Sequence, residues 1–407
     1  METYNNYGMN QGNINPVVKI KVIGVGGGGS NAVNRMIDAG INGVEFIAVN
    51  TDKQALQISK ADYRIQIGSK LTRGWGAGAD PEVGYAAAEE NLEELTQAVS
   101  DADLVFITAG MGGGTGTGAA PMIAGLTREK EILTIAVVTK PFNFEGRRRM
   151  ENAEKGLEAL RKTVDSLVII PNEKLFKLVP KGTSIVDTFR YADDVLRQGV
   201  QGISNLIIEN SLINLDFADV RTTMKNRGLA HMGIGRAKGE RRIFEALSQA
   251  VSSPLLETTI EGATGIIFNV KGGTSLPIDQ VHEAADLMRE IVDPNCNIIF
   301  GASIDESLDD SVEITVIATG FQGSDLLDRN EREENDHVSQ QKYAEFLASK
   351  IESGKMSANN LDESEKELVG GYSQNVSAPN NAGKSSRMSV DFDESDIPAF
   401  VRRLRGK

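Results

Sequence analysis

The sequence is poor in the residues that build disulfides and metal clusters. Its 407 residues include one cysteine, Cys296, which excludes an intrachain disulfide and any multi-cysteine metal site. Cys296 begins the apolar run CNIIFGA, so we interpret it as a buried, inert thiol rather than a nucleophile. The three histidines, His231, His282 and His337, lack a ligand spacing such as HExxH. We therefore assign the histidines no chemistry.

Long apolar runs and an excess of basic residues are also missing. No stretch reaches the roughly 18 apolar residues of a membrane span, and the start METYNNYGMNQGNINP lacks both segments of a signal peptide. We therefore expect a cytoplasmic protein without direct membrane insertion. The net charge of −14 argues against general nucleic-acid binding, because phosphate contacts need a basic surface.

What the sequence does contain is a regular alternation of strand and helix signals. Apolar, β-branched runs predict strands at 17–26, 44–52, 103–110, 132–142 and 165–172. Helical spacing of apolar residues predicts helices between them, at 31–40, 86–100, 120–130 and 148–164. Nearly continuous apolar strands that alternate with helices indicate an α/β fold with a parallel sheet covered on both faces.

The pattern changes after residue 180. Apolar residues at helical spacing, without proline, predict one long helix over 183–210 that joins two units. After residues 226–242, a connection rich in glycine and arginine, a smaller α/β pattern follows. It has helices at 241–253 and 277–293, and strands at 264–273, 296–305 and 312–320.

Polar sequence at both ends has little to bury, so we predict disorder there. The predicted organisation is a disordered N-terminus, a first α/β domain, a central helix, a smaller α/β domain, a disordered linker and a C-terminal peptide. Their respective bounds are 1–16, 17–182, 183–212, 213–321, 322–388 and 389–407.

The segment GVGGGGSNAV (24–33) lies between a predicted strand and a predicted helix and contains a GxGxxG pattern from Gly24 to Gly29. Glycines let backbone N–H groups approach a phosphate, and the positive end of the helix favours the anion. Taken alone, the pattern suggests a dinucleotide-binding dehydrogenase. The second strand, however, closes with NTD at 50–52 rather than with a ribose-binding acid. The segment therefore predicts binding of a phosphate group but does not indicate NAD.

A second glycine-rich segment, AGMGGGTGTG (109–118), also lies between a strand and a helix. Its N–H groups can form a second anion cradle, and the hydroxyls of Thr115 and Thr117 are available to phosphate oxygens or a metal. Two cradles on one sheet edge suit a nucleoside triphosphate. A structural turn does not require six glycines.

A P-loop lysine is absent. The nearest match to GxxxxGK[ST], APNNAGKS at 378–385, begins with alanine and lies in polar sequence without a preceding strand. We therefore expect backbone dipoles and Mg²⁺ to hold the phosphates.

Together these motifs resemble the FtsZ family, the bacterial tubulin homologues of cell division. The resemblance covers 17–321 and rests on GVGGGGSNAV, VNTD, GAGADPEVG, GGGTGTG, PFNFEGRRR, VQGISNLI and NLDFADV, of which GGGTGTG is nearly diagnostic. It implies a Rossmann-like GTP-binding domain, a long central helix and a smaller α/β domain. It also implies GTP and GDP as ligands with Mg²⁺, and hydrolysis coupled to assembly of head-to-tail filaments at the mid-cell division site.

The resemblance also assigns residues to the phosphates by matching positions. Along the diphosphate it implies Gly27, Gly28, Gly29, Ser30 and Asn31, with Asn50 and Asp52 nearby. Around the γ-phosphate it implies Ala77, Gly78 and Ala79. Wrapping the phosphates it implies Gly112, Gly113, Gly114, Thr115 and Gly116.

For the nucleoside, the resemblance implies Glu145 at the ribose, Arg149 at the nucleotide and Phe189 stacked on guanine. It implies that Asp193 reads the base edge, and a carboxylate can accept bonds from the N1 and N2 donors of guanine. Without the resemblance, Asp193 reads equally well as a solvated helix charge.

In NLDFADV, Asp216 and Asp219 stand three residues apart, so on a helical turn both carboxylates share a face, with Asn214 beside them. Spacing alone favours a helix N-cap made by Asn214 or Asp216. The resemblance favours catalysis instead, because it implies that this loop reaches the nucleotide of the next subunit and polarises the attacking water.

The last segment, DIPAFVRRLR from Asp396 to Arg405, has an apolar face at helical spacing and arginines, which suits a short linear motif. The resemblance implies that it docks on membrane tethers and other division proteins.

Two other hypotheses remain. An NAD-dependent oxidoreductase predicts nicotinamide binding and no concentration threshold for activity. A tubulin-like regulator that binds GTP without polymerising predicts a defective NLDFADV loop, which is intact here.

Overall fold

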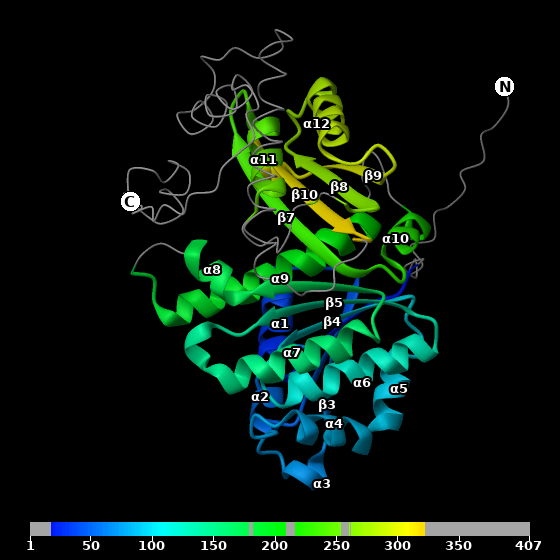
Figure 1. The fold of residues 1–407 in the computed structure, drawn as a ribbon, viewed down its shortest axis with the longest axis vertical. Coiled ribbons are helices and arrows are strands. Elements are labelled where there is room, and N and C mark those ends of the chain that lie inside the picture. Colours follow the sequence, from blue (N-terminus) through cyan, green and yellow to red (C-terminus); the bar gives the residue numbers. More distant parts are fainter. Residues whose placement is uncertain (1–17, 179–181, 209–215, 254–259, 261, 322–407) are drawn as a thin grey trace, which may run out of the picture.

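The computed structural model describes residues 18–178, 182–208, 216–253, 260 and 262–321 (Figure 1). The predicted N-terminal segment, linker and C-terminal peptide lie outside these residues. Within the described part of the chain, every helix is too short or too polar to cross a membrane.

The first half of the sheet is parallel and confirms the predicted α/β class. Its strands are β1 (Ile20–Val25), β2 (Val44–Asn50), β3 (Tyr63–Gln66), β4 (Leu104–Gly110), β5 (Leu133–Lys140) and β6 (Ser166–Pro171). They lie in the order β3-β2-β1-β4-β5-β6, and each neighbouring pair is parallel. Their carboxyl ends therefore share one edge of the sheet and their amino ends the other.

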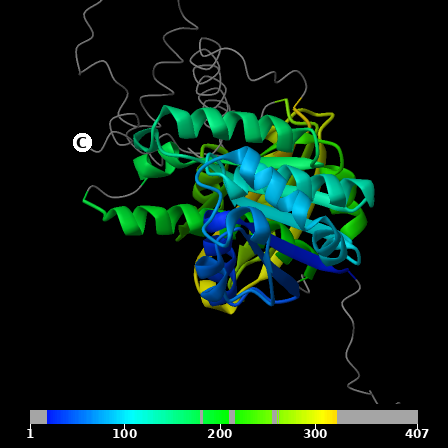
Figure 2. The ribbon, with the colours of Figure 1, turned by 90° about the horizontal axis from the view of Figure 1, so that it is seen from below.

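Helices cover both faces of these strands, as the turned view shows (Figure 2). They are α1 (Gly26–Asp38), α2 (Lys53–Gln57), α3 (Ser69–Thr72), α4 (Pro81–Glu90), α5 (Leu92–Val99), α6 (Thr115–Glu129), α7 (Arg147–Arg161), α8 (Asn172–Leu178) and α9 (Ile185–Ile208). One core joins the sheet to α1 and α9, and a second core joins its other face to α5, α6 and α7. This two-sided burial explains why the strands are apolar at nearly every position.

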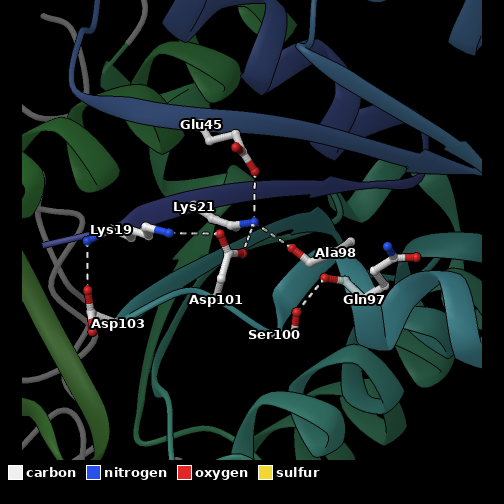
Figure 3. Close-up of polar contacts among 8 residues, drawn as sticks. All are labelled: Lys19, Lys21, Glu45, Gln97, Ala98, Ser100, Asp101 and Asp103. Atoms are coloured by element: carbon white, nitrogen blue, oxygen red, sulfur yellow. Dashed lines mark hydrogen bonds and ion pairs between the residues drawn. The ribbon is translucent and has the colours of Figure 1, made fainter. Parts of the chain in front are cut away.

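A buried lysine ties together the amino ends of the central strands (Figure 3). The Nζ of Lys21 on β1 lies 2.9 Å from Glu45 of β2 and 2.6 Å from Asp101, and it donates to the carbonyl of Ala98 at 2.8 Å. Burial alone would lower the pKa of Lys21, but the hydrogen bonds to Asp101 and Glu45 outweigh it and raise the pKa. The charged ammonium thus joins β1, β2 and the segment before β4, at the edge away from the glycine-rich segments.

The second half adds β7 (Gly228–Lys238), β8 (Gly265–Gly272), β9 (Asn297–Ile304) and β10 (Ser311–Thr319), covered by α11 (Arg242–Val251) and α12 (Ile278–Ile291). β10 is antiparallel to both β7 and β8, and β8 is parallel to β9. β7 joins β6 through a short parallel ladder, Ser166 to Gly228 through Val168 to Ala230. The described residues therefore form one sheet of ten strands.

The interpretation of residues 226–242 as a connection is wrong, because most of this segment is the long strand β7. Glycine is rare in strands, so the glycines of this segment suggest a loop. A Cβ atom on Gly233 would lie 1.9 Å from the carbonyl oxygen of Ala250, and one on Gly235 would lie 1.8 Å from that of Ala246. Glycine is needed there so that α11 can pack directly on the strand backbone.

Two helix predictions also differ in detail. The segment 86–100 is two helices, α4 and α5, because Asn91 has a non-helical backbone and its Oδ1 accepts the N–H of Gly68 at 2.9 Å. The helix predicted at 31–40 begins earlier than expected. Gly26 to Gly29 form the first turn of α1, which follows β1 immediately.

Candidate functional site

Two glycine-rich helix starts lie side by side at the carboxyl edge of the sheet. β1 leads directly into α1, and the neighbouring β4 leads through Gly110 to Gly114 into α6. A Cβ on Gly26 would lie 2.9 Å from the backbone nitrogen of Gly116, and one on Gly28 would lie 3.2 Å from that of Gly110. The absence of side chains therefore brings the two backbones into contact, and the positive ends of two helices share one region.

The N–H groups of these two helix starts are left uncapped. Within the described residues, neither α1 nor α6 has a side-chain cap or an acidic residue in its first turn. By contrast, α2 and α4 are capped by the carboxylates of Asp52 and Asp80. Uncapped N–H groups at a helix start form a binding site for an anion.

There is room for a ligand beside these groups. A Cβ on Gly27 or Gly113 would meet no atom within 4 Å. Ser30, one helical position beyond Gly29, is 3% exposed, and its Oγ has no hydrogen-bond partner among the described residues. The exposed Asn31 follows it on α1. Open space, uncapped N–H groups and an unpaired hydroxyl together fit the phosphates of a nucleotide.

The two threonine hydroxyls expected to be available to phosphate or metal have other partners in the structure. The Oγ1 of Thr115 lies 2.6 Å from that of Thr51, and the Oγ1 of Thr117 accepts the N–H of Gly112 at 2.8 Å. Both bonds are buried. The hydroxyls fix the shape of the glycine segment, which leaves the backbone as its main donor.

The loop with Ala77, Gly78 and Ala79 packs over this segment. A Cβ on Gly114 would lie 2.7 Å from the Cβ of Ala77, whereas one on Gly78 would meet nothing within 4 Å. Ala79 has a left-handed backbone, with φ of 60°, and its carbonyl accepts a bond from Asn152 of α7 at 3.2 Å. The loop therefore presents open backbone beside the glycine segment.

The pair Asn50 and Asp52, at the end of β2, is engaged in local structure. The Oδ1 of Asn50 accepts the N–H of Asp52 at 3.2 Å, and Asp52 caps α2 by accepting the N–H groups of Gln54 and Ala55. Asn50 is 3% exposed, so its amide is held at the carboxyl edge of the sheet.

The residues expected at the nucleoside also form a connected group. The Glu145 carboxylate accepts the N–H of Phe142 at 2.9 Å and pairs with Arg149 at 3.0 Å. The ring of Phe189 on α9 lies edge-on to Phe142, 5.3 Å between centroids, and is 40% exposed. The start of α7 reaches the glycine segment, because a Cβ on Gly112 would lie 2.6 Å from the carbonyl oxygen of Arg149.

Asp193 is not a solvated helix charge. Its side chain is 19% exposed and lies 3.3 Å from the Nε of Arg35 on α1. Burial raises the pKa of Asp193 to about 6, although the Arg35 guanidinium opposes this shift. Its neighbour Asp194 instead bonds Arg197 and Gln198 on its own helix.

Sequence reasoning missed one polar residue at this edge. Asn172 begins α8 directly after β6, is 5% exposed, and its Oδ1 has no hydrogen-bond partner among the described residues. A buried, unpaired amide at the carboxyl end of a strand is a candidate ligand contact. Asn172 could have been found from the sequence in the same way as Asn50, because both asparagines lie at the end of an apolar strand.

The predicted carboxylates lie at the opposite edge. Asp216 is the N-cap of α10 (Phe217–Met224), and its Oδ1 accepts the N–H of Asp219 at 2.8 Å, so the capping interpretation is confirmed. Both side chains are exposed, whereas Asn214 lies outside the described residues. The other end of α10 contacts the amino end of β6, where the Oγ of Ser166 donates to the carbonyl of Met224 at 2.6 Å.

Figure 1 shows α10 to the right of the strands and α8, which follows the carboxyl end of β6, to their left. One copy of the chain therefore holds the phosphate-binding geometry and the carboxylate pair at two separate edges. In the described residues, no cluster of three histidine, cysteine, aspartate or glutamate side chains could hold a metal ion.

The structure also shows the surroundings of Cys296 and His231. Cys296 is half-buried rather than buried, and burial raises the pKa of its thiol, which disfavours the reactive thiolate. Burial lowers the pKa of His231 to about 4, and its ring packs edge-on against Phe321 at 4.7 Å.

This fold and this edge define a class, the α/β proteins with two adjacent glycine-rich helix starts at the carboxyl edge of parallel strands. Residues 19–180 match the model of the Tubulin/FtsZ family GTPase domain, and residues 228–322 match that of the FtsZ family C-terminal domain. The chain belongs to the FtsZ family and is a GTPase.

Solved structures agree with this assignment. The chain is 48% identical to FtsZ from M. jannaschii, described as an empty dimer, with a TM-score of 0.72 over 75% of this chain and 89% of that one. It shares its fold with CetZ2 from Haloferax volcanii, described as a GTPγS-bound protofilament, at 21% identity, TM-score 0.65, and coverage of 80% and 99%. CetZ1 from the same organism, described as a GDP-bound monomer, matches at 22% identity, TM-score 0.63, and coverage of 79% and 98%.

Proposed function

We propose that this chain is a self-assembling cytoskeletal GTPase, whose head-to-tail filaments build the cytokinetic ring of a dividing bacterial cell. The main support for this proposal is that the two glycine-rich helix starts and the carboxylate pair lie at opposite edges of the parallel half of the sheet. Stacking one copy on the next brings the two edges together, and a heterologous contact that does not close gives an open filament. A dimer of an FtsZ relative supports such self-association.

The proposed nucleotide site uses the cradle as described. Backbone N–H groups of α1 and α6 bind the phosphates, with Ser30 and Asn31 beside them and Ala77 to Ala79 at the γ-phosphate. Glu145, Arg149, Phe189 and Asp193 bind the nucleoside. Mg²⁺ takes few protein ligands, and no cluster of carboxylate, histidine or cysteine side chains in the described residues would hold it. Bound together with the nucleotide, it would neutralise phosphate charge.

The proposed reaction needs both edges. Asp216 and Asp219 of the next copy, with Asn214, orient and polarise a water molecule at the γ-phosphate. The water oxygen bonds to the γ-phosphorus, the bond from that phosphorus to the bridging oxygen breaks, and the water proton passes to solvent. GDP and phosphate result. Loss of the γ-phosphate removes charge at the junction, so GTP favours assembly and GDP favours release.

The location and further partners belong to the same proposal. We place the filament in the cytoplasm at the mid-cell division site, joined to membrane tethers and other division proteins through Asp396 to Arg405. These residues lie outside the described part of the chain, so the proposal rests on their sequence alone.

We expect GTP turnover per molecule to rise steeply above a threshold protein concentration. Each junction completes one active site, so isolated copies lack the water-polarising carboxylates. Phosphate release measured across a concentration series checks this, with light scattering recorded in parallel under GTP and then GDP. The only tryptophan, Trp75, is 89% exposed, and its emission should shift to the blue if assembly covers it.

Turnover strictly proportional to concentration from the nanomolar range upward would contradict a shared site. GTP binding without scattering at any concentration would favour the non-polymerising regulator. Nicotinamide binding would favour the oxidoreductase.

We expect the affinity for GTP to increase as pH rises through about 6. Protonated Asp193 cannot accept both base-edge bonds, and the pKa of this half-buried carboxyl in the free chain is about 6. The folding trend has the opposite sign. Because the folded-state pKa is raised, Asp193 makes the free fold less stable as pH rises from about 4 through 6. Titration with a fluorescent GTP analogue measures the first trend and urea unfolding the second.

Two variants distinguish the titration of Asp193 from that of nearby groups. Asp193→Asn should flatten both pH trends between about 4 and 7. Asp194→Asn is the matched control, because Asp194 bonds residues of its own helix. It should keep the rise in affinity but move it to lower pH, because the charge of Asp194 contributes to the raised pKa of Asp193. If the affinity of Asp193→Asn for GTP still increased with pH, the titrating group would be another residue.

A further inference from the structure

α10, which carries Asp216 and Asp219 at its start, is fastened at its other end by both halves of the sheet. From the first half, Ser166 donates to the carbonyl of Met224 at 2.6 Å, and the carbonyl of Glu131 accepts a bond from Arg221 at 3.1 Å. From the second half, the Oγ1 of Thr319 donates to the carbonyl of Thr223 at 3.0 Å. Val220, Thr223 and Met224 are fully buried beneath the helix.

Asp165, one residue before β6, is the centre of this attachment. Its Oδ2 accepts the N–H of Thr134 on β5 at 2.9 Å, and its Oδ1 accepts the N–H of Asn226, just after α10, at 3.1 Å. Its carbonyl accepts the N–H groups of Arg227 and Gly228 at 2.8 and 2.9 Å. One residue thus connects the GTPase half of the sheet to the turn that ends α10.

A comparison within the chain separates this role from ordinary strand pairing. Asp62 precedes β3 and accepts the N–H of Phe46, and Asp103 precedes β4 and accepts the N–H of Lys19. Asp165 makes the same kind of bond to β5, and its second oxygen extends the pattern to the turn after α10. The hydrogen bond from the N–H of Asn226 is therefore additional to the single bond that Asp62 and Asp103 accept from the neighbouring strand.

We infer that Asp165, supported by Ser166, is a positioning residue that sets the orientation of α10 and so the place of its carboxylates at the junction with the next copy. The inference rests on the proposed function, in which Asp216 and Asp219 act on the neighbour's nucleotide. Asp165 lies at the amino edge, so it affects hydrolysis in the copy that stacks against α10 and leaves GTP binding by its own chain unchanged.

The test uses the full chain with Asp165→Asn. The Thr134 and Asn226 N–H groups bond different oxygens of Asp165, and in asparagine one of these oxygens is replaced by an NH2 group, which cannot accept a hydrogen bond. Asp103→Asn is the matched control, because one oxygen still suffices for its bond from Lys19. We expect Asp165→Asn to lower turnover per assembled copy about ten-fold, since small misplacements of catalytic groups cost that much or more. GTP affinity, KM and assembly should stay near the values of the control.

A mixing experiment then assigns the defect to an edge. Asp165→Asn mixed with Asp216→Asn should recover no turnover, because both copies are defective at the amino edge. Gly27→Ala, altered at the cradle, should recover turnover when mixed with Asp216→Asn, because their junctions combine an intact cradle with an intact α10. Recovery in the Asp165 mixture, or unchanged turnover of Asp165→Asn alone, would overturn the inference.

The mixtures also separate this inference from the proposed function. If the Gly27 mixture fails to recover, the shared site itself is wrong, and the role of Asp165 falls with it. Ser166→Ala provides an independent variant. It removes the bond to Met224 without changing charge, and we expect it to lower turnover in the same direction while GTP affinity is kept.

Discussion

GTP turnover should fall at least about 100-fold in Asp216→Asn, while GTP binding and the stability of α10 stay near normal. The substitution separates the two roles open to this residue. Asparagine caps a helix as well as aspartate does, so the bond to the N–H of Asp219 is kept, whereas the negative charge that polarises water is lost. Phosphate release above the assembly threshold, together with titration of a fluorescent GTP analogue, measures both effects.

Asp216→Ala is the companion variant, because it removes the cap as well as the charge and should lose about 1 kcal/mol of helix stability in addition. If Asp216→Asn turned over GTP like the unsubstituted chain while Asp216→Ala did not, Asp216 would be a cap only. The mechanism would then rest on Asp219 and Asn214.

Gly27→Ala and Gly29→Ala should change stability in opposite directions. A Cβ on Gly29 would lie 2.3 Å from the carbonyl oxygen of Thr108 on β4, so alanine there forces the helix off the sheet and costs about 3 kcal/mol. A Cβ on Gly27 meets no atom within 4 Å, and alanine in a helix is more stable than glycine by about 0.5 kcal/mol. Urea unfolding of the two variants measures the difference.

GTP affinity should nevertheless fall for both variants. In Gly29→Ala it falls because the fold is damaged. In Gly27→Ala the chain is more stable, yet the new methyl group occupies the space proposed for the phosphates, and we expect a loss of about ten-fold or more. A Gly27→Ala chain that binds GTP normally would remove α1 from the phosphate site.

Sequence patterns were sufficient for the elements whose burial is regular. The central strands are buried on both faces and read as continuous apolar runs, so β1, β4, β5 and β6 could be predicted. β7 could not. Its Gly233 and Gly235 read as loop residues until the backbone of α11 is placed against them.

The site divides in the same way. The glycine segments are visible in the sequence because no ordinary turn needs so many glycines. The bond between Thr51 and Thr115 and the pair Arg35 and Asp193 join residues 64 and 158 positions apart, so only the fold reveals them. Asp216 could be predicted as a cap from spacing alone, and the structure confirms this without excluding a role at the junction.

Parallel strands all run in one direction, so the carboxyl edge and the amino edge of this half of the sheet present different groups. A head-to-tail stack of these chains would have the same polarity, so its two ends would differ: one would expose an uncovered nucleotide site and the other an uncovered α10. In the proposed filament, a new copy would add to the first end through its α10 and to the second end through its nucleotide site. A copy that cannot form the contact at one of these edges would therefore block growth at one end of the filament and leave the other end able to extend.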